Sequence, residues 1–137
     1  MQAVSIHVVD VANGVVAQGM QVDIFRAGTD HDANAPTGTS GAAVTAAEPR
    51  WSLFLTAPVG ANGVVDGIEA HPQPFTPGLY EARLHVADYY RARGTDLPRP
   101  AFMEVQVFRF GLADVSQHCH LPVKLTAWGL SCFRGAA

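Results

Sequence analysis

Three histidines stand where they could act on a substrate together. His118 and His120 flank a cysteine near the C-terminus, and His7 lies in an apolar segment near the N-terminus. Residues two apart in a strand project from one face, about 6.6 Å apart at ~3.3 Å per residue, so His118 and His120 should face the same way. Imidazoles titrate near neutral pH, so a histidine can activate water as a general base, and two of them in one pocket can share the acid and base roles.

Strands are predicted wherever apolar and polar residues alternate between glycines or prolines. Residues 4–9 and 20–25 alternate in this way, and the Asn13-Gly14 turn is expected to join them, with His7 on the face opposite the core. Further segments with the same period are 51–56, 63–69, 79–86, 102–110, 118–126 and 129–134. About eight short strands at this spacing predict an all-β fold, an antiparallel β-sandwich.

One short helix and one long loop complete the predicted elements. Residues 87–93 are the predicted helix, ended by Gly94 and the prolines that follow. Residues 27–50 are rich in Ala, Gly, Thr, Asp and Pro and have no period, which predicts a long loop. A surface insertion is the favoured interpretation of this loop, and a lid over a neighbouring subunit's pocket is the alternative.

Composition indicates a single domain over residues 1–137. Apolar residues make up 48% of the chain, enough for one core. The net charge is −3 and the basic residues are scattered, so neither nucleic acid nor a membrane is expected as a partner.

No apolar run approaches the roughly 20 residues that span a bilayer, and no leader precedes Val4, so a cytoplasmic protein is expected. Cys119 and Cys132 are expected to be reduced packing residues.

Four segments repeat a known pattern in their order and spacing. The C-terminal one opens His118-Cys-His-Leu-Pro-Val-Lys-Leu-Thr and ends Phe133-Arg-Gly. The others are Ser5-Ile-His-Val-Val-Asp with the Asn-Gly turn, the segment 51–65, and Gly78-Leu-Tyr-Glu with the later Ala-Asp-Tyr-Tyr. This pattern resembles the transthyretin-like 5-hydroxyisourate hydrolases, whose C-terminal signature reads His-x-His-Val-Pro-Leu-Leu-Leu-Ser and ends Tyr-Arg-Gly-Ser. The resemblance runs from about residue 4 to the end.

The resemblance implies a fold, an assembly and a set of roles. It implies a transthyretin-like sandwich in a homotetramer, in which the C-terminal strands of two subunits build each site. His7 and His120 would position and deprotonate water, and Arg134 would hold the developing anion. The implied substrate-binding residues are Ser131 and Phe133 in the wall, Gly135, and His118, whose part is smaller because it can merely support the strand.

Three departures from the family's pattern each remove a hydrogen-bonding group. The family's catalytic arginine falls at Val64, its terminal tyrosine at Phe133 and its terminal serine at Ala136. An unpaired buried polar group costs ~1 to 3 kcal/mol, so a site that pairs with ring N–H groups rejects ligands that lack them. Loss of such groups suits an N-methylated hydroxyisourate, derived from a methylated xanthine.

Lys124 could compensate for the missing cation. It replaces the middle leucine of the family's Leu-Leu-Leu run and shares a predicted strand face with His120, about 13 Å beyond it at ~3.3 Å per residue. Its flexible stem could carry an ammonium toward the pocket. The alternative is a solvent-facing lysine on an exposed strand.

Zinc is the alternative chemistry for the three histidines, because His-x-His with a third histidine is an acceptable ligand set. No acidic residue stands beside His118 or His120, and the resembling family uses no metal, so no cofactor is expected. The remaining histidines, His31, His71 and His85, are expected to be structural or surface residues.

The expected function is hydrolysis of a cyclic amide C–N bond in 5-hydroxyisourate or an N-methylated relative. The alternative is a non-catalytic small-molecule binder, as transthyretin itself is. The histidines and the Arg134-Gly135 terminus favour the enzyme, whereas Val64 favours the binder.

Overall fold

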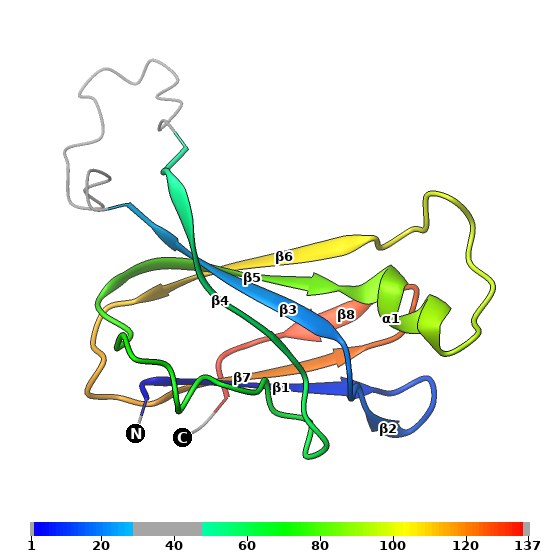
Figure 1. Cartoon of the computed structure of the whole chain (residues 1–137), viewed down its shortest axis with the longest axis horizontal. Helices are drawn as coiled ribbons and strands as arrows, with labels where there is room; N and C mark the ends of the chain where they lie inside the picture. The colour runs from blue at the N-terminus through cyan, green and yellow to red at the C-terminus, as the bar shows by residue number, and fades with distance from the viewer. Residues whose placement is uncertain (1, 29–47, 136–137) are drawn as a thin grey trace.

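The computed structural model describes residues 2–28 and 48–135 (Figure 1). Most of the predicted loop at 27–50 lies outside these residues, as does His31. Within them, no helix is both long enough and apolar enough to cross a membrane.

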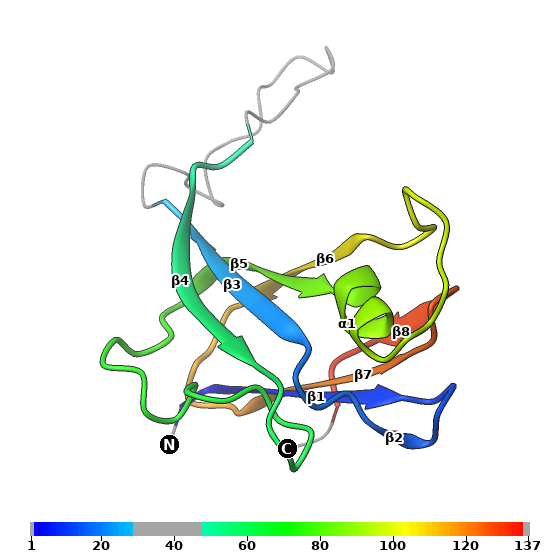
Figure 2. The same cartoon turned by 45° about the vertical axis from the view of Figure 1, so that its right-hand side comes forward.

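Two four-stranded sheets pack face to face (Figures 1 and 2). One sheet has the order β2-β1-β7-β8, with bounds β2 Val15–Val16, β1 Val4–Asp10, β7 Cys119–Leu125 and β8 Leu130–Cys132. The other has the order β4-β3-β5-β6, with bounds β4 Trp51–Pro58, β3 Gln21–Ala27, β5 Gly78–His85 and β6 Val105–Leu112. The predicted β-sandwich of about eight strands is therefore confirmed.

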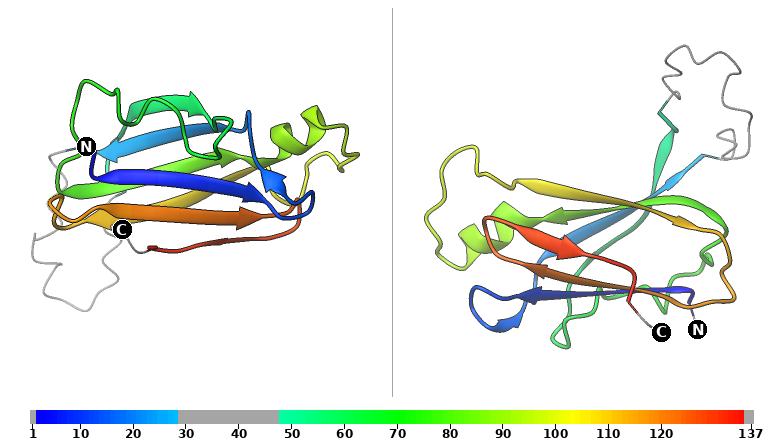
Figure 3. Two further views of the ribbon diagram at one scale, coloured as in Figure 1. Left: turned by 90° about the horizontal axis from the view of Figure 1, so that it is seen from below. Right: turned by 180° about the vertical axis from the view of Figure 1, so that it is seen from behind.

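All pairings between these strands are antiparallel except one. β1 and β7 run parallel over their whole lengths, from Val4 opposite Cys119 to Asp10 opposite Leu125. Figure 3 shows the two strands side by side near the chain termini, with β8 on the far side of β7. This pairing joins the first and the penultimate strand of the chain.

Burial alternates along β1 and β7, as the period-two pattern predicted. The core-facing side chains of the two strands are buried, and those between them remain partly exposed, apart from Lys124, which is exposed. The core also holds large side chains from the opposite sheet and the helix, including Tyr80, Tyr90 and Ile24. His7 therefore lies on the outer face of its sheet, as expected from the sequence.

Two predicted features of the strands are wrong. Residues 63–69 form turns instead of a strand, because Gly63 (φ +86) and Gly67 (φ +79) take left-handed conformations that interrupt an extended chain. Only Val64 and Val65 make isolated bridges there. The Asn13-Gly14 turn exists, but it leads into the short β2, and β3 then belongs to the other sheet.

The helix α1, Val86–Ala92, follows β5 directly and lies at the end of the sandwich away from the termini (Figure 2). Its place is fixed by Asp10, whose fully buried carboxylate accepts hydrogen bonds from the hydroxyls of Tyr89 (2.9 Å) and Tyr90 (2.7 Å) and from the side-chain amide of Asn13 (2.7 Å). Burial alone would raise the pKa of Asp10, but these hydrogen bonds outweigh it and hold the pKa below its usual value. The carboxylate therefore stays ionised and ties β1 to the helix.

The residues expected to be structural have structural contacts. His71 donates from Nε2 to the Phe54 carbonyl at 2.7 Å, and His85 Nε2 lies 2.8 Å from the Asp23 carboxylate. Cys119 is a buried free cysteine, and Cys132 is a partly buried one. Burial, with a smaller effect from Cys119, raises the pKa of Cys132 to about 11, so this thiol stays protonated at neutral pH.

Candidate active site

The parallel pairing of β1 and β7 brings His7 and His120 together on the outer face of their sheet. Ser5 lies opposite His120, and His7 lies opposite Pro122, so the two histidines are diagonal neighbours. Their ring centroids are 6.5 Å apart, and the ring planes are tilted by 36°. Both side chains are partly exposed, which leaves them open to a ligand.

Ser5 connects the histidines of the His-x-His segment. Its hydroxyl lies 2.7 Å from Nδ1 of His120 and 2.8 Å from Nε2 of His118. Nδ1 of His118 in turn lies 3.1 Å from the main-chain carbonyl of Gln2. Sequence analysis did not place Ser5 in the site. The alternation of β1 sets it on the same face as His7, but only the pairing with β7 shows what it contacts.

The environment of His120 favours its neutral form. Partial burial is the largest cause that lowers its pKa below 6.5, and the imidazoles of His7 and His118 lower it further. His120 therefore remains an unprotonated base at a lower pH than an isolated histidine would.

Val64 lies directly beside His7. The two residues form an antiparallel bridge, flanked by hydrogen bonds from Val8 N to Gly63 O (2.8 Å) and from Val65 N to Ile6 O (2.9 Å). This pattern defines a non-hydrogen-bonded pair, in which the Cα atoms are only about 4.5 Å apart and the side chains are close. The position at which the sequence resemblance predicted the loss of an arginine is thus next to His7, and it is apolar.

Two glycines leave room for the imidazole rings. A Cβ on Gly63 would lie 2.6 Å from Nε2 of His7, so the imidazole would have to shift, and the φ of +86° also favours glycine. A Cβ on Gly135 would lie 3.2 Å from Cδ2 of His120 and 3.1 Å from Cδ of Pro122. Gly63 is a second site residue that sequence analysis missed, and its signal was the glycine of the Asn-Gly dipeptide before Val64.

The C-terminal segment borders the same face. Gly135 bridges to His120, with its N–H donating to the His120 carbonyl at 2.7 Å, and Ser131 lies opposite Lys124 in the β7–β8 pairing. Ser131, Phe133 and Arg134 are exposed. Among the described residues, nothing forms a hydrogen bond or ion pair with the Arg134 side chain. The structure brings the predicted histidines together, whereas the Arg134 side chain is exposed and has no such partner.

Lys124 is also exposed on this outer face, opposite Val9 of β1. It is two residues beyond Pro122, which pairs with His7. With strands ~4.8 Å apart and ~6.6 Å between alternate residues, the Cα atoms of His7 and Lys124 are roughly 8 Å apart. The lysine is therefore closer to His7 than its spacing from His120 along the chain suggested.

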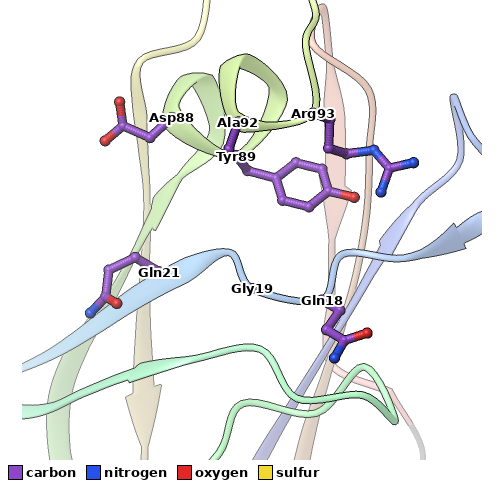
Figure 4. A pocket seen from close by; sticks show the side chains of 7 residues that line it. All are labelled: Gln18, Gly19, Gln21, Asp88, Tyr89, Ala92 and Arg93. Atoms are coloured by element: carbon purple, nitrogen blue, oxygen red, sulfur yellow. The ribbon is translucent and has the colours of Figure 1, made fainter.

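Within the described residues, neither a metal-binding group nor a hollow beside α1 adds to this site. No group of three His, Cys, Asp or Glu side chains is arranged to hold a metal ion within residues 2–28 and 48–135. A hollow of about 310 Å³ lies between α1 and the start of β3, lined by residues such as Gln18, Tyr89 and Arg93 (Figure 4). It contains none of the predicted site residues.

Comparison with known families identifies the family of the chain. The sequence model of the HIUase/Transthyretin family matches residues 4–135, nearly the whole chain. The chain belongs to this family. The family prediction made from the four sequence segments is thereby confirmed.

Relatives within the HIUase/transthyretin family are named as hydrolases. A protein of Rhizobium meliloti named 5-hydroxyisourate hydrolase 2 is 35% identical over 130 residues, covering 95% of this chain and 92% of its own length. The 5-hydroxyisourate hydrolase of Pseudomonas aeruginosa is 29% identical over 136 residues, covering 99% and 93%. These names agree with the predicted enzyme class, a hydrolase.

Solved structures of the family share the fold. The 5-hydroxyisourate hydrolase of Klebsiella pneumoniae has a TM-score of 0.67 at 18% identity, covering 99% of this chain and 100% of its own. Sea bream transthyretin in complex with thyroxine has a TM-score of 0.73 at 14% identity, covering 98% and 96%. The transthyretin-like sandwich is confirmed by both.

The environment of His120 gives a testable prediction about its titration. We expect a midpoint below 6.5 in an NMR titration, because burial and the two neighbouring imidazoles disfavour the cation. A lowered pKa means that the neutral base persists as the pH falls and is lost only below 6.5. His7→Gln should raise the midpoint by removing one imidazole, and His85→Gln on the other sheet should leave it unchanged. A midpoint at or above 6.5 would contradict this account.

Proposed function

We propose that this chain opens the ring of 5-hydroxyisourate, or of an N-methylated relative, by hydrolysing a cyclic amide C–N bond. The observation that carries the proposal is the pair of His7 and His120, 6.5 Å apart on an open sheet face. The relatives named 5-hydroxyisourate hydrolase support the substrate class.

The two imidazoles divide the proton transfers. A centroid separation of 6.5 Å leaves room for a water oxygen within the ~2.6 to 3.2 Å reach of a nitrogen on each ring. His120, with its lowered pKa, takes the proton from the water as its oxygen attacks the ring carbonyl. The C–N bond then breaks, and the proton taken up by His120 passes through His7 to the leaving nitrogen. Arg134 holds the developing anion, and His118 supports His120.

The wall of the site favours a substrate with few ring N–H groups. Val64 lies beside His7 without a donor or acceptor, and Phe133 and Ser131 belong to the C-terminal segment on the same side. An N-methyl group needs no hydrogen-bond partner and can pack against an apolar wall, whereas a ring N–H in the same place would lack an acceptor. We therefore propose methylxanthine degradation as the source of the substrate.

Lys124 supplies the positive charge that Val64 lacks. The lysine shares the outer face with His7, its Cα is roughly 8 Å away by strand spacing, and its stem is long and flexible. Among the described residues nothing pairs with its ammonium. The charge is free to approach a bound anion.

We also propose that the chain works as a homotetramer in the cytoplasm. The histidines lie on an open sheet face, and exposed side chains such as Phe133 (49% exposed) border it, so a second copy of the chain would cover the site and exclude water from it. Analytical ultracentrifugation of the purified chain would measure the assembly.

A non-catalytic binder is the second candidate, favoured by the absence of a cation at Val64. Such a protein would bind the same ring on the same sheet face without turnover. Kinetics on the unmodified protein separate the two functions.

The first functional prediction concerns the histidine pair. His7→Ala and His120→Ala should each lower kcat on the order of 10²- to 10⁴-fold, the usual contribution of an acid or base, with unchanged circular dichroism because both side chains are outside the core. His118→Ala should be milder, and His85→Ala on the other sheet should leave kcat unchanged. Near wild-type turnover by His7→Ala would show that the pair is wrong.

The second prediction concerns substrate choice. An N-methylated hydroxyisourate should have a kcat/KM on the order of tenfold above that of the unmethylated compound, as expected from ~1 to 3 kcal/mol for an unpaired group. Val64→Arg should shift the preference toward the unmethylated ring. Both substrates would be generated freshly and compared side by side. A wild-type preference for the unmethylated ring would refute the proposed specificity.

The third prediction concerns Lys124. Lys124→Met should lower kcat with little effect on folding, because Met keeps most of the apolar stem and removes the charge. Arg99→Met, which removes an exposed charge elsewhere, serves as the matched control and should not change kcat. Adding Val64→Arg to the Lys124→Met variant should recover part of the loss. An unchanged kcat/KM in Lys124→Met would mean that Lys124 is only a solvated strand residue.

A further inference from the structure

Ser5 belongs to the histidine network, but the proposed chemistry gives its hydroxyl no task. Its hydroxyl bridges Nδ1 of His120 (2.7 Å) and Nε2 of His118 (2.8 Å), and Nδ1 of His118 reaches the Gln2 carbonyl (3.1 Å). The three contacts form a continuous chain of hydrogen bonds from the Gln2 carbonyl through His118 and Ser5 to His120.

The direction of each hydrogen bond follows from the carbonyl at the start. A carbonyl oxygen only accepts, so Nδ1 of His118 carries the proton and, in the neutral ring, Nε2 does not. The hydroxyl of Ser5 therefore donates its single hydrogen to His118. Toward His120 the Ser5 oxygen can only accept, so Nδ1 of His120 must be the donor.

The consequence lies at the other nitrogen of His120. A neutral imidazole with its proton on Nδ1 has a free lone pair on Nε2. Among the described residues, nothing hydrogen-bonds to Nε2 of His120. This is the nitrogen that can take a proton from water.

We propose that Ser5 is a positioning residue that holds His120, through His118 and the Gln2 carbonyl, in the tautomer whose Nε2 is free to act as a base. The catalytic role of Ser5 rests on the proposed hydrolysis, whereas the assignment of the His120 tautomer rests only on the hydrogen bonds. A hydrogen bond to one nitrogen commonly fixes the role of the other, and loss of such supporting partners commonly costs activity. The proposal also gives His118 a function distinct from that of the acid and base.

The test measures the tautomer directly. In protein labelled with ¹⁵N-histidine, long-range ¹H–¹⁵N correlation spectra at alkaline pH, where imidazoles are neutral, should show His120 with its proton on Nδ1. Ser5→Ala should move the proton partly or wholly to Nε2. Ser5→Thr keeps the hydroxyl and should retain the wild-type tautomer. Ser52→Ala on β4, in the other sheet, is the matched control and should not change it. A wild-type His120 protonated on Nε2, or a tautomer unaffected by Ser5→Ala, would overturn the proposal.

Kinetics of the same variants test the positioning role. Ser5→Ala should lower kcat on the order of 10- to 100-fold with a smaller change in KM, and Ser5→Thr should restore most of it. A shifted tautomer with unchanged kcat would overturn the positioning role. If the wild-type protein shows the expected tautomer but opens no hydroxyisourate, the assignment of Ser5 stands and the proposed function falls, so the two failures are distinguishable.

Discussion

The parallel pairing of β1 with β7 is the constraint on which the candidate site depends. It aligns seven residues of each strand, from Val4 opposite Cys119 to Asp10 opposite Leu125, and buries one face of both strands in the core. The register is fixed by that burial, because a slip of one residue would turn every apolar side chain outward. The register that buries these apolar residues also determines which outward-facing residues of β1 and β7 lie beside one another. His7 and His120 become neighbours because the apolar residues that alternate with them along β1 and β7 are buried in the core.

The site depends on small and apolar residues beside the histidines as well as on the histidines themselves. Gly63 and Gly135 have no Cβ where a Cβ would meet the rings of His7 and His120, and Val64 leaves an apolar surface beside His7. The turn at Gly63 is also the reason that a predicted strand fails there, since its left-handed backbone cannot continue an extended chain. A local break in regular structure thus brings Val64 against β1.

Periodicity located the strands but could not identify their partners. The alternation in residues 4–9 and 118–126 correctly predicted which side chains face the core, since the pleat has a fixed period of two. The same pattern gave no information on strand order, so the turn at Asn13-Gly14 was taken to join residues 4–9 to 20–25, which belong to opposite sheets. The motif resemblance predicted the transthyretin-like sandwich correctly, because motif order reports a whole topology at once.

The sequence by itself determined the identity of the histidines, their placement on outer strand faces and the family. Each of these is a property of residue type, local period or motif order. Only the tertiary structure decided that Ser5 meets His118 and His120, at separations of 113 and 115 residues, and that Val64 bridges to His7. Such contacts depend on which strands pair and in which register, and these follow from burial of the whole core and not from any local segment.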